Sequence, residues 1–320
     1  MDMGLIGSNV YFMDKIAGNR RLIFAFEAVP PPLKGDLASV AGQRAEDIAK
    51  RINPNADCVD AFFIPELVNG RGYMPPVSYA DALKYKINSE FVLYRVTVHE
   101  KKQAQISWLE NAVQNGYSNI IPVGGDSGSE KYPGISPLEF APIASRMGFF
   151  QGGVCIPSRG KLPRGKNPLD FELESRKMVE KENAGISYHV TQILYETEGL
   201  KTTLQHYKNL SQENQSVPKR VIIGVTPILD AKNCNYLESL GVIIPSQVKD
   251  KIFSDNNPVR ICERSAGYVI EMLDRFFDTE FKENGKKFGI YTESIRHSGI
   301  SAYTDFFFKL RERFSGFAKE

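Results

Sequence analysis

The stretch FVLYRVTVHEKKQAQISWLENAVQNGYSNIIPVGG (91–125) decides the predicted fold, because it contains a strand, a helix and a second strand in succession. Its two ends are apolar runs rich in β-branched and aromatic residues, as is typical of strands buried in a parallel sheet. The segment between them has helical periodicity, which places Ile106, Leu109 and Val113 on the face expected to pack on the sheet. A strand, a crossover helix and a strand predict a right-handed parallel unit.

The same alternation extends outward to both ends of the chain. Six further apolar runs complete a set of predicted strands: LIFAFEAV (22–29), VDAFFIPE (59–66), GGVCIPS (152–158), YHVTQILY (188–195), RVIIGVTPI (220–228) and KFGIYTES (287–294). Eight strands close naturally into a barrel, whereas a doubly wound sheet usually has fewer strands and a glycine-rich phosphate loop. We therefore predict the α/β class and a single-domain (β/α)8 TIM barrel over 22–320, preceded by an N-terminal extension, 1–21.

Composition and charge exclude several classes of function. The chain has 320 residues, 40 of them basic and 38 acidic, and a formal net charge of +2. Such a balance, without a basic block, predicts no nucleic-acid partner and no membrane-surface binding. The chain also lacks a signal-peptide pattern and a long apolar run, and its four cysteines are scattered. We expect a cytoplasmic protein without a metal site.

Glu27 is the first candidate for catalysis, because it ends the first predicted strand, where barrels place their chemistry. It lies among Phe24, Phe26 and Val29, and such burial would raise its pKa and suit it to general-acid catalysis near neutral pH. The alternative is a structural ion pair with a basic neighbour such as Arg95.

Asp126 and Gln192 follow the fourth strand and end the sixth. Gly124 and Gly125 precede Asp126 and would let a flat ligand approach the backbone, although an aspartate here can also begin a turn. Gln192 is an amide in an apolar run, where it could bind the edge of a heterocyclic amide or satisfy neighbouring backbone groups.

The loop SRGKLPRGK (158–166) carries four basic residues, of which Arg159 is the first. It could bind the phosphates of a dinucleotide or the glutamate tail of a folate. The alternative is a solvated basic loop.

Taken in order, these segments resemble the catalytic barrel of methylenetetrahydrofolate reductase, over roughly residues 22–297. The motifs that carry the resemblance are FEAVPP, IIPVGGD, EKENAGISYHVTQILY, GVTPILDAKNCNYLESLGVIIP and IYTES. The resemblance implies an oxidoreductase acting on CH–NH donors. Its reaction would reduce 5,10-methylenetetrahydrofolate to 5-methyltetrahydrofolate with NAD(P)H, in the one-carbon metabolism that serves methionine biosynthesis.

The resemblance also implies roles for individual residues. Glu27 matches the general acid that protonates the folate as its imidazolidine ring opens to an N5-methylene iminium ion. Asp126 and Gln192 match positions that bind the pterin. Asn233 and Arg296 lie next to the positions of a glutamine and an arginine that the family places near the folate.

Members of this family usually carry FAD, and the chain departs from the family at the flavin-contacting positions. Arg95 replaces a histidine, Gly124 and Gly125 follow the strand without the usual arginine, and Arg159 lies where an aromatic and imidazole stretch is expected. Lys181 is retained, but it could equally be a solvated surface lysine. These departures resemble a branch that works without flavin. We therefore expect NAD(P)H as the direct hydride donor, with FAD as the alternative.

Three other functions remain open at this point. A pterin-dependent methyltransferase, or its methyl-carrying partner, would bind folate without a nicotinamide nucleotide. A flavin dehydrogenase uses the same type of barrel, and a non-catalytic barrel could serve as a binding subunit. Retention of Glu27, Asp126 and Gln192 argues against loss of chemistry. The sequence does not decide between a homo-oligomer, a partner subunit and a monomer.

Overall fold

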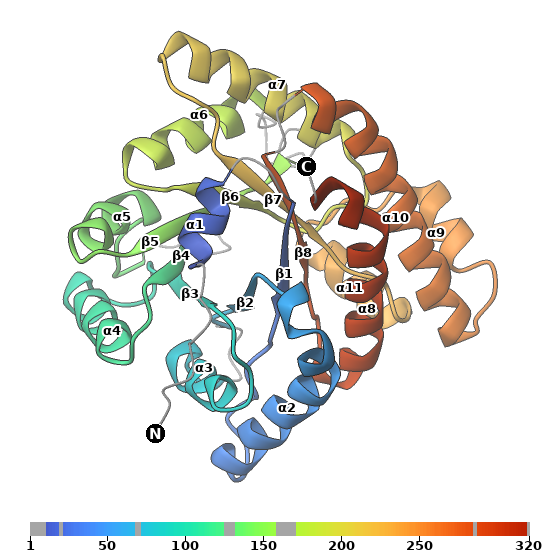
Figure 1. The fold of residues 1–320 in the computed structure, drawn as a ribbon, viewed down its shortest axis with the longest axis horizontal. Helices are drawn as coiled ribbons and strands as arrows, with labels where there is room; N and C mark the ends of the chain where they lie inside the picture. The colour runs from blue at the N-terminus through green and yellow to red at the C-terminus, as the bar shows by residue number, and fades with distance from the viewer. Residues whose placement is uncertain are drawn as a thin grey trace, which may run out of the picture.

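The computed structural model describes residues 11–18, 22–67, 72–124, 132–157, 171–283 and 287–318. These residues form a closed barrel of eight parallel strands surrounded by helices, which Figure 1 shows from one end. Neighbouring strands follow the order of the chain, and the last strand pairs with the first to close the sheet. The predicted (β/α)8 barrel is confirmed.

Strands and helices alternate along the chain as the sequence predicts. The strands are β1 (Ile23–Glu27), β2 (Ala61–Ile64), β3 (Phe91–Val96), β4 (Asn119–Val123), β5 (Phe150–Cys155), β6 (Tyr188–Thr191), β7 (Arg220–Val225) and β8 (Phe288–Thr292). The helices are α1 (Phe12–Ala17), α2 (Leu37–Ile52), α3 (Pro76–Lys84), α4 (Lys102–Gln114), α5 (Pro137–Arg146), α6 (Phe171–Asn183), α7 (Glu198–Glu213), α8 (Ala231–Ser239), α9 (Ser246–Ile252), α10 (Pro258–Glu283) and α11 (Ile300–Phe314). Short 3-10 turns, η1 (Asn53–Cys58), η3 (His297–Gly299) and η4 (Ser315–Ala318), complete the described elements.

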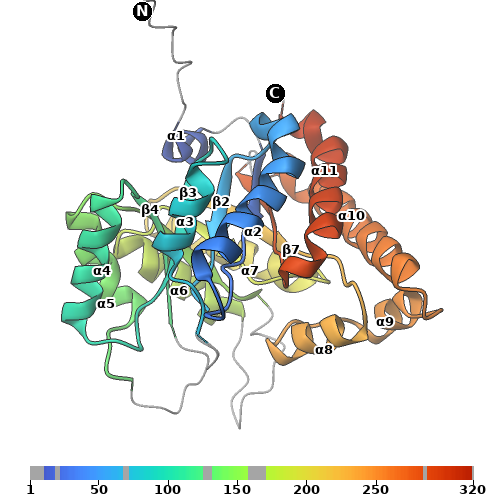
Figure 2. The same cartoon turned by 90° about the horizontal axis from the view of Figure 1, so that it is seen from below.

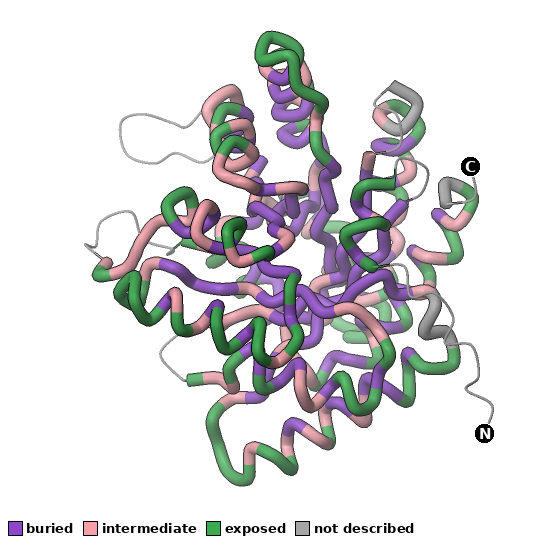
Figure 3. Tube along the Cα trace, turned by 60° about the vertical axis from the view of Figure 1, so that its left-hand side comes forward, coloured by how far each residue is buried: buried purple, intermediate pink, exposed green. Residues whose placement is uncertain are grey.

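Each strand is buried on both faces, because helices cover the outside of the barrel and side chains fill its interior. Successive side chains point to opposite faces, so every second residue of a strand points into the barrel interior. The interior cluster includes Ile23, Ala25, Val92, Ile121, Tyr188, Ile222 and Tyr291. The residues between them point outward and pack against the helices. Figure 3 shows the buried centre and the exposed outer surfaces of the helices.

Helix α1 closes the N-terminal end of the barrel, opposite α8 and α9 in Figure 2. The Phe12 ring is fully buried and meets Phe63 and Tyr188 edge-on, with ring centroids 6.1 Å and 5.7 Å away. The guanidinium of Arg220 donates to the backbone carbonyl of Ile16 at 3.1 Å. The described part of the predicted extension 1–21 therefore packs onto the barrel core.

Helix α4 corrects one detail of the sequence prediction. Leu109 is buried as expected, but Val113 is 48% exposed, so its assignment to the inner face is wrong. The inward face instead includes Gln105, whose amide nitrogen donates to the carbonyl of Thr97 at 2.8 Å. A buried amide that is hydrogen-bonded in this way can take an inward position that an apolar pattern would not give it.

No helix of the described residues is long and apolar enough to cross a membrane.

Candidate active site

The C-terminal ends of the strands bring several titratable side chains together inside the barrel. Glu27 ends β1 on the same face as Ile23 and Ala25, so its side chain points into the interior. By the same alternation, Tyr291 of β8 points inward, and Glu293 follows it on the same face. The first and last strands therefore carry carboxyl groups into one end of the barrel.

The Glu27 carboxyl group is held by two donors from the β8 side of this seam. The Tyr291 hydroxyl donates to Oε2, and the Ser294 backbone N–H donates to Oε1 at 3.1 Å. Burial raises the pKa of Glu27 from its usual 4.5 to about 7, although both hydrogen bonds work in the opposite direction by stabilising the ionised form. Such a carboxyl group can carry or release a proton near neutral pH.

Glu293 is a second carboxyl group of this region. Burial, and then the charge of Glu27, keep its pKa well above the usual value. Burial also raises the pKa of Tyr94 and Tyr291, so both phenols keep their protons and remain hydrogen-bond donors. This end of the barrel thus contains two carboxyl groups with raised pKa values and two neutral phenols.

These side chains open into a pocket with a volume of about 390 Å³. Its inner wall includes Glu27, Tyr94 and Glu293. The polar and aromatic residues nearer the rim come from α2, α8 and the loops after β2 and β8, namely Arg44, Tyr73, Tyr236, Arg296 and His297. Aromatic rings and convergent polar groups in one concave site are typical of small-molecule binding. The pocket is acidic inside and basic toward the rim.

The basic residues at the rim are anchored by the protein. Arg44 donates to the carbonyl of Pro30 at 3.2 Å, and the His297 ring lies 3.2 Å from a carboxylate oxygen of Asp47. Arg296 donates to Asp230 at 2.5 Å, while its Nε is buried without a hydrogen-bond partner among the described residues. A buried guanidinium nitrogen in this position could donate to an anionic group of a ligand.

Three of the predicted substrate-binding residues are described, and they lie at or near this pocket. Arg296 lines it directly. Gln192 donates from its amide nitrogen to the carbonyl of Leu240 at 2.5 Å, and Leu240 is part of the pocket wall. Asn233 is buried in the first turn of α8, where its side-chain oxygen accepts from the Leu229 N–H at 3.1 Å. Asn233 therefore holds the loop that leads into the helix.

The predicted cofactor residues that are described do not line the pocket. Arg95 points outward, beneath α4, where it donates to Gln105 and to Glu66 at 2.7 Å each and also pairs with Glu100. The alternative of a structural ion pair between Glu27 and Arg95 is therefore wrong, because Glu27 points into the barrel and Arg95 points away from its interior.

Lys181 of α6 donates to the backbone carbonyl of Val154 in β5, which places it at a helix–strand contact. Gly124 is exposed just after β4. Asp126, Gly125 and Arg159, and the basic loop to which Arg159 belongs, lie outside the described residues. Within the described ranges, no group of three or more His, Cys, Asp or Glu side chains could hold a metal ion.

The sequence analysis missed Tyr94, Tyr291 and Glu293. A period-two reading of each strand would have found them, because Tyr94 has the inward parity of Val92, and Glu293 has that of Tyr291. Arg44 has no such signal, because it lies in the middle of α2 and reaches the pocket only through the packing of that helix.

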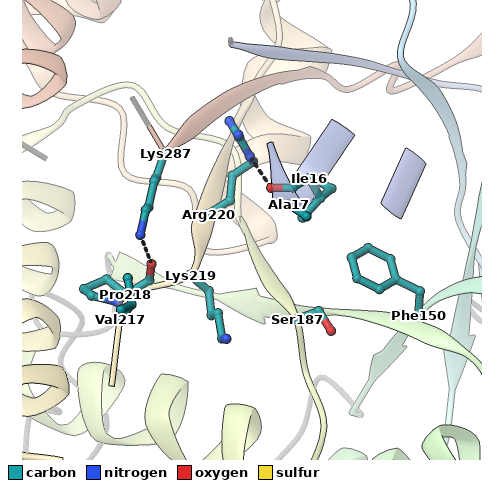
Figure 4. Close-up of a pocket in the computed structure, with 9 residues that line it drawn as sticks. All are labelled: Ile16, Ala17, Phe150, Ser187, Val217, Pro218, Lys219, Arg220 and Lys287. Atoms are coloured by element: carbon teal, nitrogen blue, oxygen red, sulfur yellow. Dashed lines mark hydrogen bonds between the residues drawn. The ribbon is translucent and has the colours of Figure 1, made fainter. Parts of the chain in front are cut away.

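A second cavity lies at the opposite, N-terminal end of the barrel and has a volume of about 270 Å³ (Figure 4). Two of its three basic side chains bind backbone carbonyls: Lys287 lies 3.3 Å from the carbonyl oxygen of Pro218, and Arg220 donates to Ile16. These contacts join α1 to the starts of the strands, so we interpret this cavity as structural.

Comparison with known proteins identifies similar folds. No family model and no curated protein sequence matches the chain. An uncharacterized protein from Clostridium thermocellum, which binds two copies of 5-methyl-5,6,7,8-tetrahydrofolic acid, has a TM-score of 0.76 at 19% identity, over 94% of this chain and 99% of that chain.

The oxygenating constituent of 3,6-diketocamphane monooxygenase from Pseudomonas putida, a type II Baeyer-Villiger monooxygenase in complex with FMN, has a TM-score of 0.52 at 10% identity, over 93% and 98% of the two chains. At such low identities, both likenesses establish the fold alone.

Proposed function

We propose that this pocket binds a tetrahydrofolate and that the protein reduces 5,10-methylenetetrahydrofolate to 5-methyltetrahydrofolate with NAD(P)H. The observation that carries the proposal is the position of Glu27, a buried carboxyl group with a pKa of about 7 in the wall of a ligand-sized pocket. A general acid needs a pKa near the working pH so that it holds a proton and can still release it.

In this proposal Glu27 donates its proton to N10 of the folate as the bond between N10 and the methylene carbon breaks. The electron pair of that bond remains on N10, and the methylene group becomes an iminium ion on N5. NAD(P)H supplies the hydride that converts this group to a methyl group. The carboxylate left on Glu27 stabilises the neighbouring cation until the hydride arrives, and Tyr291 and Ser294 hold that carboxylate in place.

The polarity of the pocket suits the two ends of a folate. The rings of Tyr73, Tyr94 and Tyr236 offer flat surfaces for a pterin or its aminobenzoyl group. Arg44 and Arg296 would attract the glutamate carboxylates toward the rim. The C. thermocellum protein, which has the same fold over nearly its whole length and binds 5-methyltetrahydrofolic acid, gives further support.

The remaining proposed contacts follow from the resemblance. Gln192 and Asp126 would bind the pterin, and Asn233 would hold the loop from Leu229 to α8 in place beside the folate. What supports such a role for Gln192 is its nearness to the pocket, since its amide nitrogen donates to the carbonyl of Leu240 in the pocket wall.

The described residues fit a resident flavin poorly. Arg95 and Lys181 occupy flavin-contacting positions by resemblance. Arg95 points outward and binds Gln105, and Lys181 of α6 binds the backbone carbonyl of Val154 in β5. We therefore propose that the nicotinamide passes its hydride directly to the folate. Gly124, Gly125 and Arg159 remain candidates for binding that nucleotide.

The decisive experiment uses the purified chain in two assays. The visible spectrum is recorded for bound flavin, and NAD(P)H oxidation is followed with 5,10-methylenetetrahydrofolate. We expect a colourless protein that oxidises the nucleotide only when the folate is present. Glu27→Gln should lower turnover by about 10²- to 10⁴-fold without loss of fold.

The main alternative, a pterin-dependent methyltransferase or methyl-transfer partner, predicts a different pattern. Such a protein would bind 5-methyltetrahydrofolate but neither NADH nor NADPH in isothermal titration. A yellow protein with stoichiometric FAD would refute the flavin-free route, and the absence of any folate binding would refute the proposal as a whole.

A further inference from the structure

We propose that Glu293 acts in this pocket as a neutral carboxylic acid that pairs with a cyclic amide edge of the ligand, donating its O–H to the ring carbonyl and accepting the ring N–H. This inference rests on the proposed function, because the pterin of a folate carries such an edge at N3 and C4. It adds a binding residue that lies two positions beyond Tyr291 and outside the residues predicted to bind substrate.

The first argument is the place of the Glu293 side chain. Its carboxyl group lies over Gly224 of β7, since a Cβ atom built on that glycine would be 2.5 Å from Oε1 of Glu293. The same Cβ would be 2.8 Å from the backbone oxygen of Thr191. The glycine thus leaves the space that the Glu293 carboxyl group occupies over β7, and Glu293 also lines the pocket.

The second argument is the absence of donors around this carboxyl group. No described residue donates a hydrogen bond to it, and the nearby N–H of Gly224 is already used by Oγ1 of Thr191 at 2.9 Å. The polar groups of this region include the Thr191 carbonyl, which is an acceptor, and the carboxyl group of Glu27. Glu293 is half-buried and lines the pocket, so water there is the remaining donor for an ionised carboxylate. The neighbouring charge of Glu27 disfavours that form, whereas a carboxylic acid is a donor itself.

The charges around Glu293 agree with this reading. The titratable groups that face it or share its pocket are Glu27 of β1, Tyr73 after β2, Tyr94 of β3, Tyr236 of α8, Tyr291 of β8, Arg44 of α2, and Arg296 and His297 after β8. Burial raises the pKa of Glu293, and the charge of Glu27 raises it further. Both effects favour the protonated carboxyl group.

The different environments of Glu27 and Glu293 suit these two carboxyl groups to different roles. Glu27 has two donors that stabilise its ionised form and a pKa of about 7, so it can release a proton during the reaction. Glu293 has no such donors and keeps its proton, so it can bind a ligand through both a donor and an acceptor atom. Two carboxyl groups with separated pKa values commonly take separate roles.

The test compares Glu293→Gln and Glu293→Ala in the full-length protein, with 5-methyltetrahydrofolate as the probe and isothermal titration as the measurement. Glutamine keeps one donor and one acceptor but cannot ionise, so it imitates the neutral acid. We expect Glu293→Gln to bind close to wild-type affinity and Glu293→Ala to bind about 10- to 100-fold more weakly, as the loss of a pair of hydrogen bonds implies.

The pH dependence provides the second readout. Wild-type affinity should fall as the pH rises past the pKa of Glu293, whereas Glu293→Gln should not share that loss. Glu110 of α4, an exposed glutamate on the outer surface, offers the matched control: Glu110→Gln and Glu110→Ala should both behave as wild type. Melting temperatures of all variants establish that each is folded.

The possible results separate the inference from the proposed function. If the wild-type chain binds no folate, the proposed function fails. If the wild type binds but Glu293→Gln is as weak as Glu293→Ala, then Glu293 acts as a carboxylate and the inference is overturned. Unchanged affinity in Glu293→Ala would also overturn it, because the side chain would then not touch the ligand.

Discussion

The hydroxyl of Tyr291 donates a hydrogen bond to Oε2 of Glu27 across the seam where the barrel closes. The pairing of β1 with β8 creates this contact, since Ala25 lies opposite Tyr291 and Phe26 opposite Thr292 in the ladder. Residues 264 positions apart in the chain thus form one unit. The acid at the end of the first strand therefore depends on the last strand for its orientation and its ionisation.

Removing the tyrosine hydroxyl tests this dependence. The hydrogen bond stabilises the ionised form of Glu27, so Tyr291→Phe should raise the pKa of Glu27 beyond about 7. A general acid is active while it is protonated, and the alkaline limb of the kcat/KM profile should therefore move to higher pH, by about one pH unit. Tyr85→Phe, which alters a side chain that is 81% exposed, should leave the profile unchanged. A limb that stays fixed or moves to lower pH would contradict the contact.

The raised pKa of Glu27 also predicts how stability depends on pH. Between its usual value of 4.5 and about 7, the folded protein binds the Glu27 proton more tightly than the unfolded chain does. The free energy of unfolding should therefore fall as the pH rises through this window, by about 3 kcal/mol from this group. Urea unfolding of wild type and Glu27→Gln at a series of pH values isolates the effect, because glutamine removes the titration. Parallel curves for the two proteins would show that the acid is not perturbed.

Much of the fold could be predicted from the sequence, because each strand is a short apolar run between turn residues. Such local signals identify β3 and β4 and the helix between them without knowledge of their partners. The position of α1 could not be predicted in this way, since Phe12 becomes buried only when β2 and β6 bring Phe63 and Tyr188 together. Tertiary contacts of this kind leave no local pattern.

Two residues of the pocket wall were predicted, Arg296 from the family resemblance and Glu27 from its own local signal. Glu27 stands out as a charge inside an apolar run, and the structure places it in the pocket wall. Arg95 is also a charged residue in an apolar run, but its side chain points away from the barrel interior. Its partners Gln105 and Glu66 lie outside its own strand. Glu293 was missed because its importance arises from the closure of the barrel beside Glu27.

The network around Arg95 predicts a structural role that can be distinguished from cofactor binding. Its guanidinium is buried and pairs with Glu66 and Gln105, so Arg95→Ala should leave a buried carboxylate uncompensated and destabilise the fold by about 3 kcal/mol. The affinity of the folded variant for NAD(P)H should not change. Arg176, which forms an exposed pair with Glu172, is the matched control, and Arg176→Ala should cost at most about 1 kcal/mol. If Arg95→Ala retains its stability and loses nucleotide affinity, Arg95 is a cofactor contact.

Gly224 offers a test of the way the barrel accommodates its second carboxyl group. A methyl group at this position would lie 2.5 Å from Oε1 of Glu293 and 2.8 Å from the backbone oxygen of Thr191, closer than real Cβ atoms approach. Gly224→Ala should therefore displace the carboxyl group, weaken folate binding and reduce the free energy of unfolding by about 1–3 kcal/mol. A Cβ atom added to Gly42 in α2 would have no neighbouring atom within 4 Å. Gly42→Ala should therefore stabilise the protein by about 0.5–1 kcal/mol. Urea unfolding and isothermal titration measure both effects. If the two variants behave alike, the space over Gly224 is not what admits Glu293 to the pocket.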